Sequence, residues 1–465
     1  MRHPDDEPHR PSGASPAPAR SLGDALAWLD RHVNLEALDA NLSQRGGSDG
    51  LERVRRLMEA MGDPQRTYPV VHVTGTNGKG STSRLITLLL QAQGLVVGTY
   101  TSPHLESVNE RVAVGGAPIA DDELAGVLAS LEELERFLLR QGGAGALASA
   151  PTWFELLTAA ALRHFADEAV SAAVVEVGVG GMVDATNVVD AAVAVLTNVE
   201  LDHVDVLGGT RASIAREKAG IVKAGSIVVV GETDPDLVEI VAERGRTVGA
   251  EALWRRDLDF ACTANELAHG GRQLDLRTPG AGYEGLFLPL HGAHQGDNAA
   301  VAVAAAEAFF GSPLAEEVVA EAFAEATVPG RLEVVARHPV VVLDGAHNPA
   351  GAASLGAALA DDFAAAERVV LVMGCLRGRD PAELLGAIGP ERLALVVACT
   401  PPSPRALPAA AVVEAAGRCS VAAVEADSLE VALRQAVESV GEQGLVVVTG
   451  SLYVVGAARA LLRRR

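Results

Sequence analysis

The segment from Gly75 to Ser81, GTNGKGS, has the residue types needed to bind phosphate. It lies between an apolar, β-branched run and a stretch with helical apolar spacing from Thr82 to Ala92. In such a loop, backbone N–H groups and the helix N-terminus attract anions, Lys79 adds a point charge, and Ser81 can reach a magnesium ion. The loop departs from the common phosphate-loop pattern, because Gly80 separates Lys79 from Ser81. An ordinary glycine-rich turn is the alternative, but the lysine and hydroxyl at the helix start favour a nucleoside triphosphate site.

Other polar groups follow predicted parallel strands, where open α/β sheets bind their ligands. They are Ser102 and His104 after the run at 96–100, Glu176 near the end of the run at 172–177, and Asp202 and His203 after the run at 192–197. A buried carboxylate is costly unless it is paired or metal-bound, so we interpret Glu176 as a magnesium ligand rather than a structural salt bridge. His203 could be a neutral metal ligand oriented by Asp202, or part of a loop that caps a helix. Ser102 and His104 are explained equally well as turn residues.

Two further sites have both a structural and a functional interpretation. Lys218 could complement a helix dipole just before a glycine cap, or it could be a buried amine that reacts with carbon dioxide to form a carbamate. Thr152 could cap a helix with Glu155 three residues later as a capping box, or both could contact a substrate. The residue pattern leaves both pairs of alternatives open.

Composition excludes several classes of function. The net charge of −22 argues against non-specific binding to nucleic acid or to an anionic membrane. No apolar run is long enough to span a bilayer, and the N-terminus has no apolar signal segment. The four cysteines lack metal-ligand spacing, which favours buried thiols in a reducing cytoplasm.

The order of the elements predicts two α/β domains. Residues 1–20 read as a disordered tail, residues 21–328 as a parallel-sheet domain built around the glycine loop, and residues 329–465 as a smaller Rossmann-like domain with its own parallel sheet. A polar loop at 44–49 should precede a helix at 51–61, and the segment at 225–290 should form a small, partly antiparallel sheet. Pro329-Gly330-Arg331 is the predicted hinge.

Several motifs in one order resemble the folylpolyglutamate synthase/dihydrofolate synthase family, within the Mur-type ATP-dependent amide ligases. They are HVTGTNGKGST (His72–Thr82), TSPHL and NERV (within Thr101–Val112), EVGVGGMVDATN (Glu176–Asn187), TNVELDHVDVLG (Thr197–Gly208), REKAGIVK (Arg216–Lys223), PGRLE (Pro329–Glu333), DGAHNP (Asp344–Pro349) and GSLY (Gly450–Tyr453). The resemblance runs from about Leu22 to the C-terminus.

The resemblance also implies roles for single residues. Asn77, Gly78, Lys79, Gly80, Ser81, Asn298, Arg331 and Asp344 would contact ATP; Ser102, Glu176, His203 and a carbamylated Lys218 would hold two magnesium ions; Thr152, Trp153, Phe154, Glu155, Val183, Asp184 and Ala185 would line a pterin pocket; and Lys79, Lys218 and His347 would be catalytic, with His347 near the incoming glutamate.

The implied activity is ligation of L-glutamate to dihydropteroate, to reduced folates or to both, through an acyl phosphate, by a monomer. Met182 stands where bifunctional members of the family usually have arginine, so polyglutamylation without dihydrofolate synthase activity is the first alternative. A Mur-type ligase of cell-wall precursors would need a larger domain before the glycine loop. A regulatory nucleotide-binding module would leave the ordered polar residues at the strand ends unexplained.

Overall fold

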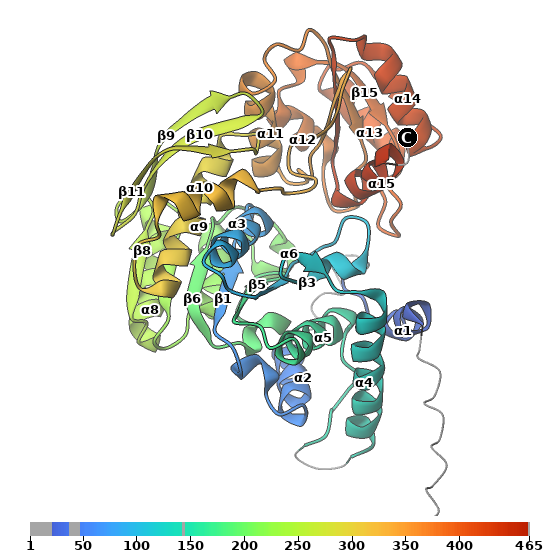
Figure 1. Cartoon of the computed structure of the whole chain (residues 1–465). Helices are drawn as coiled ribbons and strands as arrows, with labels where there is room; N and C mark the ends of the chain where they lie inside the picture. Colours follow the sequence, from blue (N-terminus) through green and yellow to red (C-terminus); the bar gives the residue numbers. More distant parts are fainter. Residues whose placement is uncertain (1–20, 37–46, 142–144, 464–465) are drawn as a thin grey trace, which may run out of the picture.

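The computed structural model describes residues 21–36, 47–141 and 145–463. The predicted tail, residues 44–46 of the predicted polar loop, and Gly142 and Gly143 lie outside these ranges. The chain forms two α/β bodies connected through the segment around Gly330, as Figure 1 shows. The prediction of an α/β fold with two sheet-containing parts is therefore confirmed.

An eight-stranded sheet organises the N-terminal body, in the order β4-β3-β2-β5-β1-β6-β7-β8. Its strands are β1 (Val70–Thr74), β2 (Val97–Tyr100), β3 (Val112–Val114), β4 (Ala117–Pro118), β5 (Ala172–Glu176), β6 (Ala191–Leu196), β7 (Ile227–Val230) and β8 (Ala252–Arg255). The run from β2 to β8 is parallel, and β3 and β4 extend the sheet in antiparallel fashion. Because β1 and β5 are parallel neighbours, the glycine loop after β1 and Glu176 at the end of β5 lie at the same edge of the sheet.

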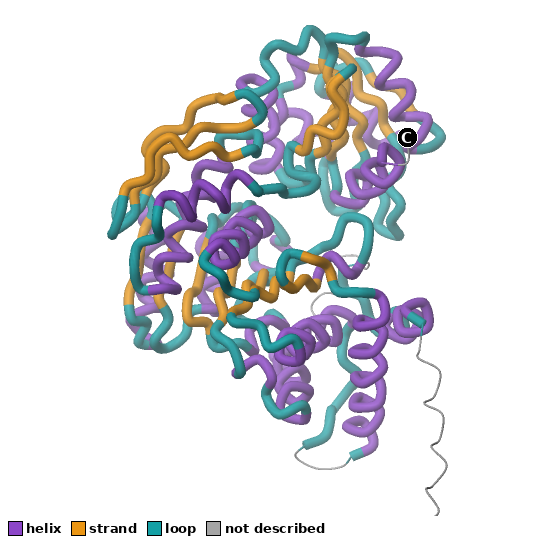
Figure 2. The backbone as a smooth tube through the Cα atoms, viewed as in Figure 1, coloured by secondary structure: helices purple, strands orange, loops and turns teal. Residues whose placement is uncertain are grey.

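Helices cover both faces of this sheet (Figure 2). They are α1 (Leu22–Leu29), α2 (Gly47–Ala60), α3 (Lys79–Ala92), α4 (Asp121–Arg140), α5 (Trp153–Asp167), α6 (Val204–Leu207), α7 (Arg211–Lys218), α8 (Pro235–Val248), α9 (His294–Phe310) and α10 (Glu316–Ala324). Since α2 begins at Gly47, the predicted polar loop is wrong for residues 47–49, which belong to the helix.

The prediction for residues 225–290 is partly wrong. β7 and β8 join the main sheet in parallel, and the helix α8 lies between them. Only β9 (Ala261–Ala268), β10 (Gly271–Arg277) and β11 (Gly282–Leu288) form the expected antiparallel sheet. The start of α8 has a clear local cause, because the Asp234 side chain accepts the N–H of Asp236 and Pro235 occupies the first turn.

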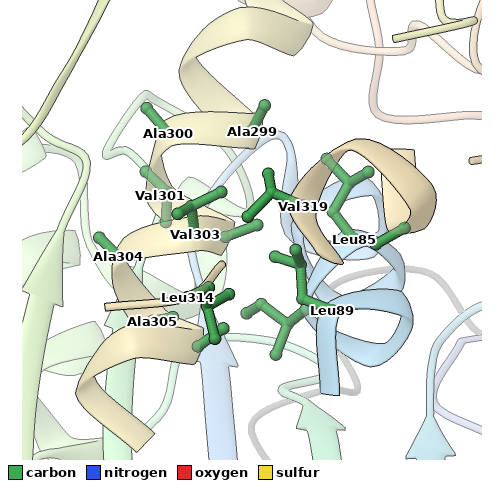
Figure 3. Close-up of a cluster of buried hydrophobic side chains, with 14 of the residues drawn as sticks. Leu85, Leu89, Ala299, Ala300, Val301, Val303, Ala304, Ala305, Leu314 and Val319 are labelled. Atoms are coloured by element: carbon green, nitrogen blue, oxygen red, sulfur yellow. The ribbon is translucent and has the colours of Figure 1, made fainter. Parts of the chain in front are cut away.

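Close packing brings α9 against α3. Figure 3 shows alanines and valines of α9 in one buried cluster with Leu85 and Leu89 of α3, with Leu314 and with Val319 of α10. Small side chains let two helices approach closely, which explains the alanine-rich sequence of α9. The approach carries Asn298, near the start of α9, to the glycine loop.

A six-stranded sheet in the order β12-β13-β17-β14-β15-β16 forms the C-terminal body. Its strands are β12 (Glu333–Arg337), β13 (Val340–Leu343), β14 (Val369–Met373), β15 (Leu393–Ala398), β16 (Ala423–Glu425) and β17 (Leu445–Thr449), and its helices are α11 (Pro349–Asp361), α12 (Pro381–Ile388), α13 (Ala409–Arg418), α14 (Leu429–Val440) and α15 (Leu452–Arg463). All neighbours are parallel except the edge strand β12. None of the helices in the described ranges is both long and apolar enough to cross a bilayer.

The antiparallel sheet also contacts the C-terminal body. Arg272 of β10 is buried, and its guanidinium lies 2.5 Å from carboxylate oxygens of both Asp361 and Asp362 at the end of α11. Asp362 also accepts the backbone N–H of Gly292 at 3.0 Å. These contacts fix one point of the interface between the two bodies.

Candidate active site

A cavity of about 170 Å³ lies between the two bodies and brings together most of the predicted site. From the N-terminal body it is lined by Asn77, Gly78, Lys79, Gly80, Ser81, Ser102, Glu176, His203 and Lys218, and from the C-terminal body by Arg331, Asp344 and His347. These residues span the sequence from 77 to 347, so only the tertiary fold makes them neighbours.

The glycine loop has the geometry of an anion site. Gly78 adopts a left-handed conformation (φ +81°), after which α3 begins at Lys79. The first-turn N–H groups of α3 therefore face the cavity, three residues earlier than the sequence pattern predicts. Lys79 Nζ donates to the carbonyl oxygens of Gly75 and Thr76 at 3.1 and 3.2 Å, which keeps the ammonium over the loop.

Asn298 does not line the cavity but supports the loop from behind. A Cβ placed on Gly78 would lie 2.5 Å from Asn298 Oδ1, and the Asn298 amide donates to Gln295 at 3.0 Å. We expect Gly78→Ala to weaken ADP binding by at least about tenfold, because the methyl group must displace Asn298 from behind the phosphate loop.

Gly94→Ala is the matched control for this variant. Gly94 has a similar backbone angle (φ +85°), and no atom would lie within 4 Å of a methyl group added there, so it reports the left-handed strain alone. Calorimetric titration with ADP compares the two variants. Equal ADP affinities would show that the contact with Asn298 is unimportant.

Glu176 meets Ser102 at the floor of the cavity. Glu176 is 3% exposed, and its Oε2 accepts the backbone N–H of Ser102 at 3.2 Å. Burial raises the pKa of Glu176, although the charges of Lys79 and Arg331 oppose the rise. A carboxylate held in this way is stabilised when a cation binds beside it.

The donor set suits magnesium that is shared with a nucleotide. In the part of the chain that the structure describes, no three His, Cys, Asp or Glu side chains form a complete metal cage. Magnesium, however, is usually held by one or two carboxylates together with substrate phosphates and water. Glu176 and the hydroxyls of Ser102 and Ser81 around one cavity fit that mode, with His203 as a neutral nitrogen donor.

Asp202 does not orient the His203 ring as the sequence suggested. Its carboxylate accepts the backbone N–H of His203 at 2.8 Å, whereas the ring nitrogen Nε2 is 3.9 Å away. The main partners of Asp202 come from the C-terminal body: Arg379 Nη2 at 2.5 Å and Asn348 Nδ2 at 3.1 Å. Burial alone would raise the pKa of Asp202, but His203, Arg379 and His347 together lower it, so the carboxylate is charged at neutral pH. The sequence analysis missed Arg379, which carries no local motif signal.

Lys218 points inward from the end of α7. It is 3% exposed, and its Nζ donates to the carbonyl oxygen of Gly75 at 2.7 Å. Burial and the nearby charge of Lys79 lower the pKa of Lys218 well below its usual value. This geometry disfavours a solvated, dipole-complementing lysine and fits a neutral, nucleophilic amine.

The C-terminal body contributes Arg331, Asp344 and His347. Asp344 accepts backbone N–H groups of Leu332 and Ala346, each at 3.0 Å, which fixes the linker against β13. Burial raises the pKa of Asp344 despite the opposing charge of Arg331. His347 Nδ1 donates to the carbonyl oxygen of Gly345 at 2.8 Å, so in the neutral ring Nε2 carries the lone pair. Burial lowers the pKa of His347 and favours that neutral form.

The residues implied for a pterin pocket lie outside the cavity lining. They are Thr152, Trp153, Phe154 and Glu155 at the start of α5, and Val183, Asp184 and Ala185 in the loop after β5. Phe154 lies directly under Gly178, a cavity residue, because a Cβ on Gly178 would be 2.7 Å from the Phe154 ring. The Asp184 carboxylate accepts hydrogen bonds from the N–H and the hydroxyl of Thr186 and from the N–H of Val179.

Thr152 and Glu155 form the capping box that the sequence allowed. Glu155 also binds Arg53 through two hydrogen bonds of 2.8 Å, and both side chains are largely buried. We expect Glu155→Ala to lower the free energy of unfolding by about 3 kcal/mol, because it leaves the Arg53 charge unpaired, and to leave ADP affinity unchanged. Denaturant unfolding and ADP titration test this. An unchanged stability with a raised KM for the pterin substrate would instead favour the substrate-contact interpretation.

Family models match both parts of the chain. Residues 130–306 match the Mur ligase middle domain, and residues 330–452 match the Mur ligase glutamate ligase domain. The dihydrofolate synthase/folylpolyglutamate synthase of Mycobacterium tuberculosis is 39% identical over 442 residues, which cover 89% of this chain and 90% of the relative. The folylpolyglutamate synthase of Lacticaseibacillus casei is 36% identical over 88% of this chain and 94% of its own length.

Solved structures agree with these matches. Mycobacterium tuberculosis folylpolyglutamate synthase complexed with ADP superimposes with a TM-score of 0.85 at 37% identity, covering 96% of this chain and 98% of that one. The bifunctional enzyme of Yersinia pestis, complexed with AMPPNP and a Mn ion, gives a TM-score of 0.80 at 32% identity, covering 97% and 100%. The chain therefore belongs to the folylpolyglutamate synthase/dihydrofolate synthase family of Mur ligases.

Proposed function

We propose that this chain is an ATP-dependent ligase that joins L-glutamate to the carboxylate of dihydropteroate, of a reduced folate, or of both. The observation that carries the proposal is the cavity in which the glycine loop, Glu176 and Lys218 face Arg331 and His347. The glycine loop can bind phosphate, and Arg331 and His347 lie opposite it. This arrangement suits a reaction in which a carboxylate, a phosphate and an amine must meet.

The chemistry needs two steps. A carboxylate oxygen of the acid substrate attacks the γ-phosphorus of ATP, and ADP leaves; Lys79 and Arg331 stabilise the negative charge on the phosphate oxygens. Bound magnesium would neutralise phosphate charge beside Glu176 and Ser102. The glutamate amine then attacks the acyl carbon and phosphate leaves. His347, neutral with its Nε2 lone pair available, can accept the proton that the amine loses.

The placement of the residues supports an ATP contact for Asp344, a carbamate on Lys218 and a pterin pocket beside Phe154. Two magnesium ions and a domain boundary at 328/329 are further parts of the proposal. A monomer remains an expectation from the family resemblance. The four cysteines are free, and burial raises the pKa of Cys375 and Cys399 to about 12, which suits a reducing cytoplasm.

Phosphate release from MgATP with L-glutamate tests the function, with dihydropteroate and a reduced folate supplied in parallel. Release with both acids shows a bifunctional enzyme that tolerates Met182, whose backbone is bound to Glu217 and whose side chain is exposed. Release with the folate alone restricts the activity to polyglutamylation. The absence of glutamate-dependent release with either acid, in folded protein, contradicts the proposal.

A further inference from the structure

The loop after β2 leaves the N-terminal body and docks on the C-terminal body. Leu105 packs against the buried cluster under α14 and α15. A Cβ on Gly456 of α15 would lie 2.0 Å from the Leu105 carbonyl oxygen, so the helix and the loop are in direct backbone contact there. A Cβ on Gly330, in the linker, would lie 3.1 Å from the Leu105 side chain. Leu105 therefore sits between the linker and α15.

Glu106 adds an ionic contact at the same place. Its carboxylate pairs with the Arg459 guanidinium of α15. Arg459 Nε also donates to both carboxylate oxygens of Glu333 at 2.9 and 3.0 Å, and Glu333 accepts the N–H of Gly330 at 2.8 Å. The loop, α15 and the linker are thus joined by a continuous series of buried or half-buried polar contacts.

The docked loop is short and internally fixed. The Glu110 carboxylate accepts three successive backbone N–H groups, from Leu105 to Ser107, at 2.9, 3.0 and 3.0 Å. Leu105 closely follows Ser102 in the chain, and the N–H of Ser102 binds Glu176 at the cavity floor. We therefore expect a displacement of Leu105 and Glu106 to move Ser102 as well, because the segment that connects them is short and held by hydrogen bonds.

We propose that Gly456 and Arg459 are positioning residues for the metal–nucleotide site. They hold Leu105 and Glu106 against α15 and the linker, and thereby position Ser102 against Glu176. The orientation of the C-terminal body is then linked to metal-dependent nucleotide binding. This inference rests on the proposed function, in which Ser102 and Glu176 face magnesium.

The test measures ADP binding by calorimetry at increasing Mg²⁺, without turnover. In Gly456→Ala and Arg459→Gln, half-maximal enhancement of ADP binding should need about tenfold more Mg²⁺, with unchanged affinity for ADP in EDTA. Gly417→Ala, at a helical glycine with open space around it, and Arg463→Gln, at a largely exposed arginine 3.6 Å from Glu106, are the matched controls and should behave as wild type. The rate of amide hydrogen exchange at residues 102–107 should rise only in Gly456→Ala and Arg459→Gln.

Leu105→Ala provides a second route if Gly456→Ala fails to fold, because it removes packing without adding a clash. Wild-type Mg²⁺ dependence in folded Arg459→Gln and Leu105→Ala would overturn the inference while leaving the proposed function intact. Wild-type protein whose ADP binding ignores Mg²⁺ and that shows no glutamate-dependent turnover would overturn both.

Discussion

Lys218→Ala should lose ligase activity by at least about 100-fold, and added acetate or propionate should restore part of it. The amine is buried, lines the cavity and has a lowered pKa, so its neutral, nucleophilic form, which can add to carbon dioxide, is easier to reach than in a solvated lysine. The carbamate would place a metal-binding anion near Lys79. In the alanine variant, a short carboxylate can occupy the vacated space and supply the missing negative charge.

Lys218→Met is the matched control for this rescue. Methionine fills the same space without a charge, so the variant should be equally inactive and should not respond to acetate. Phosphate release is measured for both variants across a series of carboxylate concentrations. Equal responses of the two variants, or none in the alanine variant, would count against the carbamate and leave Lys218 as a structural donor to Gly75.

Asp202→Ala should lower kcat/KM for glutamate by about 30-fold with less than about threefold change in ADP affinity. The variant removes the carboxylate that binds Arg379 and Asn348, although Asn348 keeps its hydrogen bond to Asn77. These contacts hold α11 and α12 of the C-terminal body against the glycine-loop edge. A half-buried cation without its partner costs about 2 kcal/mol, less than a fully buried one. The nearby, exposed Asp205 provides a control, Asp205→Ala, with no expected effect.

A double-mutant cycle with Arg379→Ala separates this contact from general loss of charge. The coupling energy in kcat/KM should be at least about 1 kcal/mol. Because folding lowers the pKa of Asp202, the ion pair contributes fully above the ordinary pKa of a carboxyl group and is lost only as the pH falls through the lowered value. The cycle can therefore be measured at neutral pH, and additive effects of the two substitutions would show that the contact is not used.

Residues at the ends of parallel strands were predictable because strand direction alone places them at one edge. Glu176, Ser102 and the glycine loop follow this rule, and they line one cavity. Arg379 was not predictable, because its partner Asp202 lies 177 positions earlier in the sequence. No motif in the residues around Arg379 marks it. Lys218 is intermediate: its position at a helix end was visible, but its burial depends on how α7 packs against the loop after β1.

The errors in the fold have local causes. The prediction for residues 225–290 omits the helix α8, although Asp234 and Pro235 form its start, because β-branched residues on either side of it favour strands. The start of α2 was placed too late, since glycine and serine read as loop residues without their tertiary contacts. The antiparallel edge strand β12 has no signature that distinguishes it from linker.

Arg272 and Leu105 touch the C-terminal body at two separate places, on different elements of the N-terminal body. A rigid body held at two points keeps one degree of freedom, which is a turn about the line that joins them. If these two contacts persist while the contacts of Asp202 with Arg379 and Asn348 break, the C-terminal body can rotate only about that line. His347 and Arg379 would then move along arcs around that line. The distance from His347 to the glycine loop would depend on a single rotation angle.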